Sequence, residues 1–281
     1  MPWDIYAARA ALHMWEEPCI SGENGSGAVF FTGCTLRCVF CQNHEIAAGK
    51  RGQKIDESHL AEIFLKLQQQ KANNINLVTP TQYVLPIIAA VKKAKAQGLK
   101  IPVVYNTSGY ERVETLKNLE GIVDVYLPDF KYTDTTYAKR YSNAPDYFDV
   151  TKAALAEMVR QHPAPQFTDK QEAAVRGIEE GIMTGGVIVR HLMLPGLLKD
   201  TKAVIRYLYE TYGDSIYISI MNQYTPLPQV ADIEALNRTV TPEEYDRVLR
   251  FAERIGIERG FRQEGTAASE SFIPEFDERG L

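Results

Sequence analysis

The chain carries three of its four cysteines in one short stretch, Thr32-Gly33-Cys34-Thr35-Leu36-Arg37-Cys38-Val39-Phe40-Cys41-Gln42-Asn43. Their spacing is C-x3-C-x2-C, and the stretch follows an apolar run at residues 28–31. Three thiolates on one loop can hold an iron–sulfur cluster and leave one iron without a protein ligand. Because an open iron can take part in chemistry, this loop predicts an enzyme.

Other interpretations of the three cysteines compete with a cluster. A structural zinc site needs four Cys or His ligands, and no fourth ligand stands at zinc-ribbon spacing, although Cys19, His13 and His44 are available. A redox pair formed by the last two cysteines would leave the first one idle. Three unrelated buried cysteines would require a coincidence. We therefore favour an iron–sulfur cluster held by three thiolates.

Length, charge and composition fit an ordinary globular protein and argue against several other classes. The chain has 281 residues, 31 of them basic and 36 acidic, with a formal net charge of −5. This balance predicts neither nucleic acid nor a membrane surface as a partner. The start lacks the pattern of a signal peptide, and no apolar run reaches the roughly 20 residues that span a bilayer. Four cysteines make no disulfide framework in a chain of this size, so we expect a cytoplasmic protein.

Short apolar runs alternate with helical patterns along most of the chain. Near-continuous Val, Ile and Leu runs are typical of parallel strands covered on both faces. Strands are expected at residues 28–32, 75–78, 101–105, 121–127, 187–192 and 215–221. Helices are expected at residues 57–70, 83–96, 113–119, 147–161, 201–212 and 242–254. This alternation predicts a parallel α/β sheet, either doubly wound or a barrel, with ligands at the carboxyl ends of the strands.

Two segments interrupt the alternation. Residues 1–27 carry a helical pattern followed by a Gly/Ser-rich stretch. The span 131–186 is long for one crossover, and we expect it to hold two helices and an irregular stretch at residues 162–168.

The cysteine stretch resembles the radical S-adenosylmethionine (SAM) superfamily, with an aromatic residue before the last cysteine on the loop after the first strand. Further motifs resemble the branch that contains the pyruvate formate-lyase activating enzymes, and in particular their uncharacterised homologues. They lie at the expected ends of the third, fourth and fifth strands: Asn106-Thr107-Ser108-Gly109, Asp129-Phe130-Lys131, and Arg190 with Leu194-Pro195-Gly196.

The resemblance implies a fold and a domain organisation. The fold would be α/β, a partial (β/α)6 TIM-type barrel with extensions at both ends. A single radical SAM domain would span residues 1–281, with its core at about 28–225. Residues 1–27 would form the N-terminal extension, and residues 226–281 a C-terminal helix and tail.

The resemblance also implies cofactors. A 4Fe–4S cluster would be held by Cys34, Cys38 and Cys41. SAM would chelate the fourth iron through its amino and carboxylate groups. One electron from the cluster would cleave the sulfonium to methionine and a 5′-deoxyadenosyl radical, which abstracts hydrogen from a substrate. We expect a flavodoxin or ferredoxin as the reductant.

Two groups of residues would contact the adenine and the amino group of SAM. Phe40 lies between two ligands and would contact the adenine, with the backbone as far as Gln42 bonding the adenine edge; shielding of the cluster by Phe40 is the plainer alternative. Thr79-Pro80-Thr81 stands where family members commonly carry Gly-Gly-Glu, which binds the ammonium group. Hydroxyls and carbonyls of Thr79 and Thr81 would replace it, with Pro80 holding Thr79 extended.

Charged and polar residues at later strand ends would complete the site. Asn106 and Thr107 stand where activating enzymes place an Asp-Thr pair, and a plain turn is the alternative. Asp129 and Lys131 alternate along a strand, so both point to one face and suit a zwitterion, with a surface ion pair as the alternative. Arg190 is a charge in an apolar strand, where it is costly unless paired, and the resemblance places it near the carboxylate of SAM.

We also predict roles for three further residues. Asn222 would help to close the top of the site, and His191 would face the helices as a satisfied polar residue. Cys19 is interpreted as a substrate-side thiol or, with more weight, as a buried inert cysteine.

These observations lead to three hypotheses about function. The first is a radical SAM enzyme that abstracts hydrogen from a glycine of a partner protein, making a glycyl radical. The second is modification of a peptide or small molecule, which the altered Thr79-Pro80-Thr81 motif favours, as do Gln223 and Thr225 near the place of a histidine in activating enzymes. The third is a non-catalytic metal-binding protein, which would need a closed four-ligand site.

Overall fold

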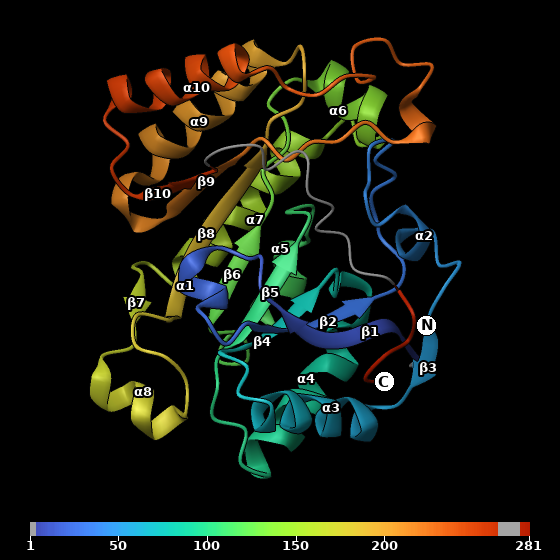
Figure 1. Ribbon diagram of the computed structural model, residues 1–281, viewed down its shortest axis with the longest axis vertical. Coiled ribbons are helices and arrows are strands. Elements are labelled where there is room, and N and C mark those ends of the chain that lie inside the picture. Colours follow the sequence, from blue (N-terminus) through green and yellow to red (C-terminus); the bar gives the residue numbers. More distant parts are fainter. Residues whose placement is uncertain (1–3, 264–275) are drawn as a thin grey trace.

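The chain folds around one mostly parallel sheet whose two edges do not meet. The computed structural model describes residues 4–263 and 276–281. Within these residues the strand order is β10-β9-β8-β6-β5-β4-β2-β1-β3, and β7 pairs with β8. Figure 1 shows the curved sheet with helices around it.

All six predicted parallel strands are present. They are β2 (Ser26–Phe31), β4 (Ile75–Val78), β5 (Val103–Thr107), β6 (Val125–Pro128), β8 (Met183–Leu192) and β9 (Tyr217–Met221). Each pairs in parallel with the next one along the chain. A doubly wound sheet reverses its strand order at a switch point, whereas this order follows the chain without reversal. The prediction of a partial TIM-type barrel is confirmed.

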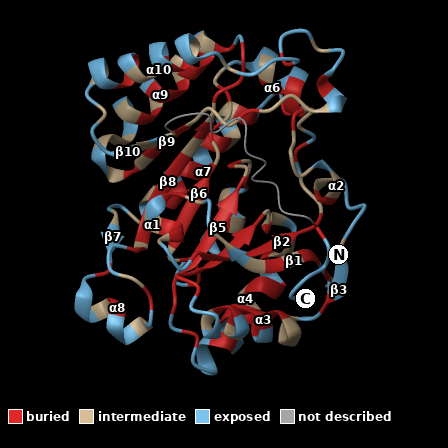
Figure 2. Cartoon of the chain, viewed as in Figure 1, coloured by how far each residue is buried: buried red, intermediate tan, exposed pale blue. Residues whose placement is uncertain are grey.

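The predicted helices also form. They are α3 (Glu57–Gln69), α4 (Val84–Ala96), α5 (Val113–Lys117), α7 (Tyr147–Gln161), α9 (Leu198–Tyr212) and α10 (Pro242–Ile255). Asp56 caps α3, where its carboxylate accepts a hydrogen bond from the backbone N–H of His59. Figure 2 shows buried strands and helices whose buried residues alternate with exposed ones. The apolar core between helices and sheet holds the outward-facing residues of each strand, such as Leu77, Tyr105 and Val189.

The N-terminal residues correct one prediction. The segment with a helical pattern contains β1 (Ile5–His13), antiparallel to β2, and β3 (Gln53–Ile55) pairs with β1 in turn. A register shift between Ala7 and Arg9 breaks the strand's period of two. This bulge, together with four alanines that favour helix, hid the strand in the sequence.

Short elements were also missed. The span 131–186 holds three helices instead of two, because α6 (Thr135–Ser142) and α8 (Lys170–Arg176) flank α7. β7 (Gln166–Phe167) lies in the stretch expected to be irregular. The remaining elements are α1 (Pro18–Ser21), α2 (His44–Ala47), η1 (Thr81–Tyr83), η2 (Gly213–Ser215), η3 (Pro228–Val230) and β10 (Gly260–Arg262). Elements this short carry too few residues for periodicity to reveal them.

The inner, concave face of the sheet has an apolar layer and a polar layer. In the apolar layer, Val104, Val125 and Ile188 pack against Ile20 of α1, which lies in front of the strands in Figure 1. Nearer the carboxyl ends of the strands the same face is polar, with Asn76, Asn106, Asp129, Arg190 and Ser219. Residues 14–21, here called the inner segment, lead from β1 into α1 beneath this polar layer. No helix in the described part of the chain is long and apolar enough to cross a membrane.

Candidate functional site

The cysteine loop is fixed against α6. The backbone N–H of Val39 donates to the carbonyl of Tyr141 at 2.8 Å, and the Cys38 sulfur lies 2.9 Å from the Ser142 hydroxyl. Leu36 and Phe40 are buried in a cluster of tyrosines and leucines from α6, α7 and the segments after β8 and β9. The apolar side chains of the loop therefore hold its cysteines in place from behind.

The three cysteines line one end of a cavity of about 350 Å³ at the carboxyl ends of the strands. Burial raises the pKa of all three thiols, that of Cys41 to about 12, while the charge of Lys131 lowers each pKa. An iron cluster would supply the positive charge that buried thiolates need. The donor set therefore fits a cluster.

A closed single-ion site does not fit the same residues. Within residues 4–263 and 276–281, no three His, Cys, Asp or Glu side chains converge closely enough to hold one metal ion. Thiolates that bind a cluster sit on separate irons and need no such convergence. The four-ligand zinc site of the third hypothesis thus has no candidate ligand set among the described residues.

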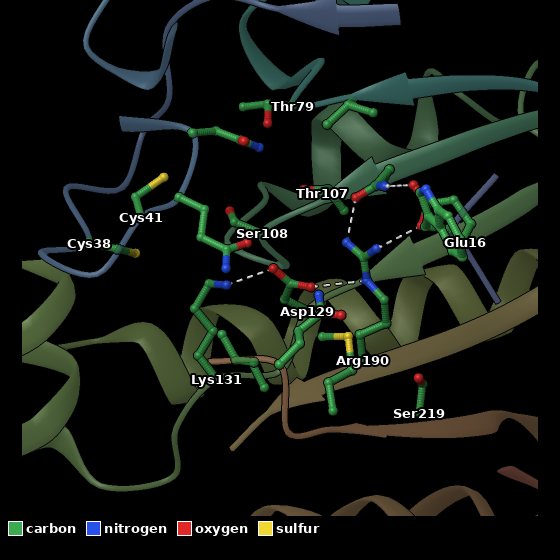
Figure 3. Close-up of a pocket in the computed structure, with 18 of the residues that line it drawn as sticks. Glu16, Cys38, Cys41, Thr79, Thr107, Ser108, Asp129, Lys131, Arg190 and Ser219 are labelled. Carbon is green, nitrogen blue, oxygen red and sulfur yellow. Dashed lines mark hydrogen bonds and ion pairs between the residues drawn. The ribbon is translucent and has the colours of Figure 1, made fainter. Parts of the chain in front are cut away.

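A row of alternating charges runs across the cavity. The carboxylate of Asp129 contacts Lys131 Nζ at 2.6 Å and Arg190 Nε at 3.2 Å, and Figure 3 shows it between the two cations. Burial by itself would raise the pKa of Asp129, but the charges of Lys131 and Arg190 hold it below the ordinary value. Asp129 therefore stays ionised. As the alternation predicts, Asp129 and Lys131 both line the cavity.

Arg190 is also bonded to the inner segment. Its Nη1 lies 3.1 Å from the carboxylate of Glu16, and its Nη2 donates to Asn106 Oδ1 at 2.6 Å. Glu16 Oε1 accepts further hydrogen bonds from the amides of Asn76 at 2.9 Å and Asn106 at 3.4 Å. The partners that a partly buried arginine requires are thus supplied in part by Glu16, which lies far away in the sequence.

The end of β4 differs from the prediction. Thr79 was expected to be extended before Pro80, but its φ is +58°. This left-handed conformation is rare for a β-branched residue and costs roughly 1–2 kcal/mol. It is held by a hydrogen bond from Thr79 N–H to the Asn106 carbonyl at 2.9 Å, and the Gln82 amide donates to the carbonyls of Thr32 and Gly33 at 2.6 and 2.8 Å. The Gln82 side chain joins this turn to the cysteine loop.

Glu111 lies behind these strand ends, on the outer side. Its Oε1 accepts hydrogen bonds from three hydroxyls, those of Thr81 at 2.6 Å, Thr107 at 2.5 Å and Tyr105 at 3.3 Å. Burial raises the pKa of Glu111, although the Thr107 and Thr81 hydroxyls act against the shift. Glu111 therefore links the ends of β4 and β5, the two places where the sequence predicts contacts to SAM.

The structure brings most of the predicted site residues into the one cavity. Besides the cysteines, they are Phe40, Gln42, Thr79, Asn106, Thr107, Asp129, Lys131 and Arg190. Thr81 and Asn222 are not among its lining residues. Thr81 turns to Glu111, and the backbone N–H of Asn222 donates to the Gln263 side chain at 2.8 Å.

Cys19 and His191 lie where the plainer interpretations put them. Cys19 of α1 packs beside the apolar layer of the sheet and does not line the cavity. Burial raises its pKa to about 12, and Glu17 adds to the shift. His191 is buried, with Nδ1 2.7 Å from the Phe130 carbonyl and Nε2 3.1 Å from the Thr201 hydroxyl of α9.

Sequence reasoning did not assign Glu16, Glu17 or Ser219 to the site, although all three line the cavity. Ser219 occupies the inward position of β9, which the strand alternation could have identified. The two glutamates follow a strand that was interpreted as helical, so only their adjacency before Pro18 was visible.

Comparison with known proteins gives matches over most of the chain. The family model of the Radical SAM superfamily matches residues 28–163. An uncharacterised protein of Methanocaldococcus jannaschii is 30% identical over 264 residues, which cover 91% of this chain and 69% of the relative.

Solved structures resemble this one in fold. Streptococcus suis SuiB bound to precursor peptide SuiA has a TM-score of 0.54 at 11% identity, over 85% of this chain and 48% of SuiB. Methylornithine synthase (PylB) has a TM-score of 0.52 at 11% identity, over 79% of this chain and 59% of PylB. The chain thus spans about half the length of SuiB.

Proposed function

This chain belongs to the radical SAM superfamily, and on that premise we propose that it reductively cleaves SAM at a 4Fe–4S cluster and abstracts hydrogen from a substrate in the same cavity. One observation carries the proposal: Cys34, Cys38 and Cys41 share a cavity with the Lys131–Asp129–Arg190 charges at the carboxyl ends of the strands. Ligands of parallel α/β folds bind at that edge.

The three cysteines would hold the cluster, which supplies the electron that breaks a carbon–sulfur bond of SAM. The Ser142 hydroxyl, within 2.9 Å of the Cys38 sulfur, would orient that ligand and stabilise its thiolate. Phe40 packs edge-on to Tyr224, with 6.4 Å between ring centroids, and this apolar wall would keep water from the cluster. Phe40 would also contact the adenine.

The charged row would position the amino-acid part of SAM. Lys131 and Arg190 each retain N–H groups beyond those bonded to Asp129, and these suit a carboxylate. Asp129 suits an ammonium, and Asn106 would bond the ribose or the carboxylate. The carbonyl of Thr79, in its left-handed turn, would replace the missing Gly-Gly-Glu. Thr81 and Thr107 would act through Glu111 by fixing the two turns.

For the substrate, the cavity favours a small molecule or a single side chain. Its volume of about 350 Å³ has to receive SAM and the cluster as well, so little room is left for a substrate, and the inner segment fills the space beneath it. A glycine loop of a partner protein, the first hypothesis, would require the rim to open. SuiB, which shares the fold, was solved with a precursor peptide bound, so a peptide side chain is a second candidate. A flavodoxin or ferredoxin as reductant and a cytoplasmic location stay predictions.

The test is SAM cleavage by the anaerobically reconstituted protein. Dithionite and SAM should give methionine and 5′-deoxyadenosine in equal amounts, detected by chromatography. Radical SAM chemistry is ruled out if the iron-loaded protein forms neither product. A persistent radical on a co-expressed protein would restore the glycyl-radical hypothesis over a small substrate.

A further inference from the structure

The cavity has an acidic end opposite the cysteines. Glu16 and Glu17 of the inner segment line it, and so does the hydroxyl of Ser219 from β9. Figure 3 shows Cys38 and Cys41 on one side, the charged row in the middle, and Glu16 beyond Arg190. The acidic end is therefore separated from the cysteines by the residues proposed to hold the amino-acid part of SAM.

The two glutamates differ in how well they are paired. Glu16 has Arg190 and two amides as partners. Glu17 is only 8% exposed, yet its Oε2 has no hydrogen-bond partner among the described residues. An unpaired buried polar atom costs roughly 1–3 kcal/mol, and more if it is charged.

The carboxyl group of Glu17 does not stabilise the helix that follows it. Glu17 precedes α1, but its backbone carbonyl, which accepts from the N–H groups of Ile20 and Ser21, makes the contacts there. Its side chain forms no cap for that helix. A smaller or apolar residue would serve the helix equally well.

The charges around Glu17 leave it without a cation of its own. Burial raises the pKa of Glu17, the charge of Arg190 lowers it, and Glu16 raises it further, while the Ser219 hydroxyl lowers it. Arg190 already serves Glu16 and Asp129.

The other titratable groups near the acidic end do not change this balance. Burial lowers the pKa of His13, which keeps that side chain neutral, and the charges of Arg190 and Arg9 act the same way. Cys19 on α1 has a raised pKa and stays neutral. Lys131 pairs with Asp129, and Arg262 pairs with Glu253 at 3.2 Å, where its side chain is 58% exposed. Three carboxyl groups, those of Glu16, Glu17 and Asp129, thus face two partly buried cations, Lys131 and Arg190, in this cavity.

We propose that Glu17, beside Glu16, binds an ammonium group of the substrate, so that the radical SAM enzyme proposed above acts on a primary amine. An ammonium group has three N–H donors, enough for the Glu17 carboxylate, the Glu16 carboxylate and the Ser219 hydroxyl. The unpartnered Oε2 is closed off in this structure, so binding requires the Glu17 side chain to turn that oxygen toward the cavity. Its charge would pair with the one carboxyl group of the cavity that has no cation, and it would lower the pKa of Glu17. The inference rests on the proposed function for the reaction. The amino group of SAM carries the same chemistry, so the test must separate the two sources.

The probes are straight-chain alkylammonium ions from ethylammonium to hexylammonium, with the matching alcohols as neutral controls. Binding to the anaerobically reconstituted enzyme is followed by calorimetry, with and without SAM, in two buffers of different ionisation enthalpy. For at least one chain length, wild type should bind the ammonium ion roughly tenfold or more tightly than the alcohol. Because the ammonium charge lowers the raised pKa of Glu17, titrations at several pH values should show proton release near that raised pKa.

Variants of Glu17 test whether this residue causes the preference for the ammonium ion. Glu17→Gln should abolish both the preference for the ammonium ion and the proton release, and Glu17→Asp should keep part of each. Asp200→Asn is the matched control, because Asp200 is also buried with an unpartnered Oδ2 among the described residues but does not line the cavity. That variant should behave as wild type.

Three results would overturn the inference. The first is a wild-type enzyme without ammonium preference, and the second is a Glu17→Gln enzyme that retains the preference. The third is a Glu17→Gln change that weakens SAM binding and leaves alkylammonium binding unaltered, because the ammonium would then belong to SAM. Since these titrations need no turnover, they fail or succeed independently of SAM cleavage.

Discussion

The two ends of the cavity are built in different ways. The cysteine end comes from one loop of the chain, in which Cys34, Cys38 and Cys41 lie within eight positions. The acidic end is assembled from the inner segment, β8 and β9, and its Glu16 pairs with Arg190 across 174 positions. The first end can be recognised in a sequence because its chemistry is contiguous. The second depends on the fold to bring its residues together.

The largest expected effect separates two cysteines, one on the cysteine loop and one on the inner segment outside the cavity. Cys34→Ala should abolish SAM cleavage and leave the protein with little cluster iron, because two thiolates remain where three are needed. Cys19→Ala should retain both, since Cys19 packs against the apolar layer. Iron analysis and product chromatography on both variants check this. Equal iron and equal cleavage in the two variants would contradict the ligand assignment.

The next effect concerns Arg190, which joins the two ends. Arg190→Met should lower the free energy of unfolding by about 3–5 kcal/mol, because it leaves Glu16 and Asp129, whose side chains are only 9% and 22% exposed, without this cation. The control is Arg250→Met, which removes an exposed partner of Asp246 and should cost less than about 1 kcal/mol. Chemical denaturation of the apoprotein measures both. A similar loss in the two variants would mean that the charged row carries no special stability.

A smaller effect tests Glu111, which supports the turns on the cysteine side. Its pKa is raised in the folded protein, so its contribution to stability is complete below the ordinary value of 4.5 and is lost as the pH rises through the folded pKa. Wild type should therefore lose stability relative to Glu111→Gln between about pH 5 and about pH 8. Denaturation curves at both pH values, with exposed Glu62→Gln as a control that follows wild type, decide the matter. If the difference in stability between wild type and Glu111→Gln stays constant with pH, the pKa of Glu111 is not raised in the folded protein.

The smallest effect concerns the turn at Thr79. Glycine adopts a positive φ without strain but is more flexible when unfolded, so Thr79→Gly should raise the free energy of unfolding by about 0.5–1 kcal/mol. The same change at Thr115, inside α5, should lower it by roughly 0.3 kcal/mol. Thermal unfolding distinguishes the signs. Destabilisation at both positions would show that the Thr79 side chain matters more than its backbone conformation.

Much of the fold could be predicted because most elements are local. The parallel strands are short apolar runs, and helices such as α3 show their own periodicity and, at Asp56, their own start. β1 could not be identified, since its bulge breaks the alternation and its pairing with β2 and β3 outweighs the preference of its alanines.

The same distinction between local and non-local signals applies to the residues of the candidate site. Asp129, Lys131 and Arg190 were found because strand alternation and a charge in an apolar run are local signals. Glu17 and Glu111 were not, because nothing nearby in the sequence says that either carboxyl is buried. Their importance comes from residues that approach only after folding.

The measurement that tests the central claim most directly is the electron paramagnetic resonance spectrum of the reduced, anaerobically reconstituted protein before and after SAM is added. A 4Fe–4S cluster with three protein ligands should give a signal that changes shape when SAM occupies the fourth iron, with about four irons per chain. Cys34→Ala should lack that signal. A colourless protein, or a cluster whose spectrum is indifferent to SAM, would contradict the assignment of this cavity to radical SAM chemistry.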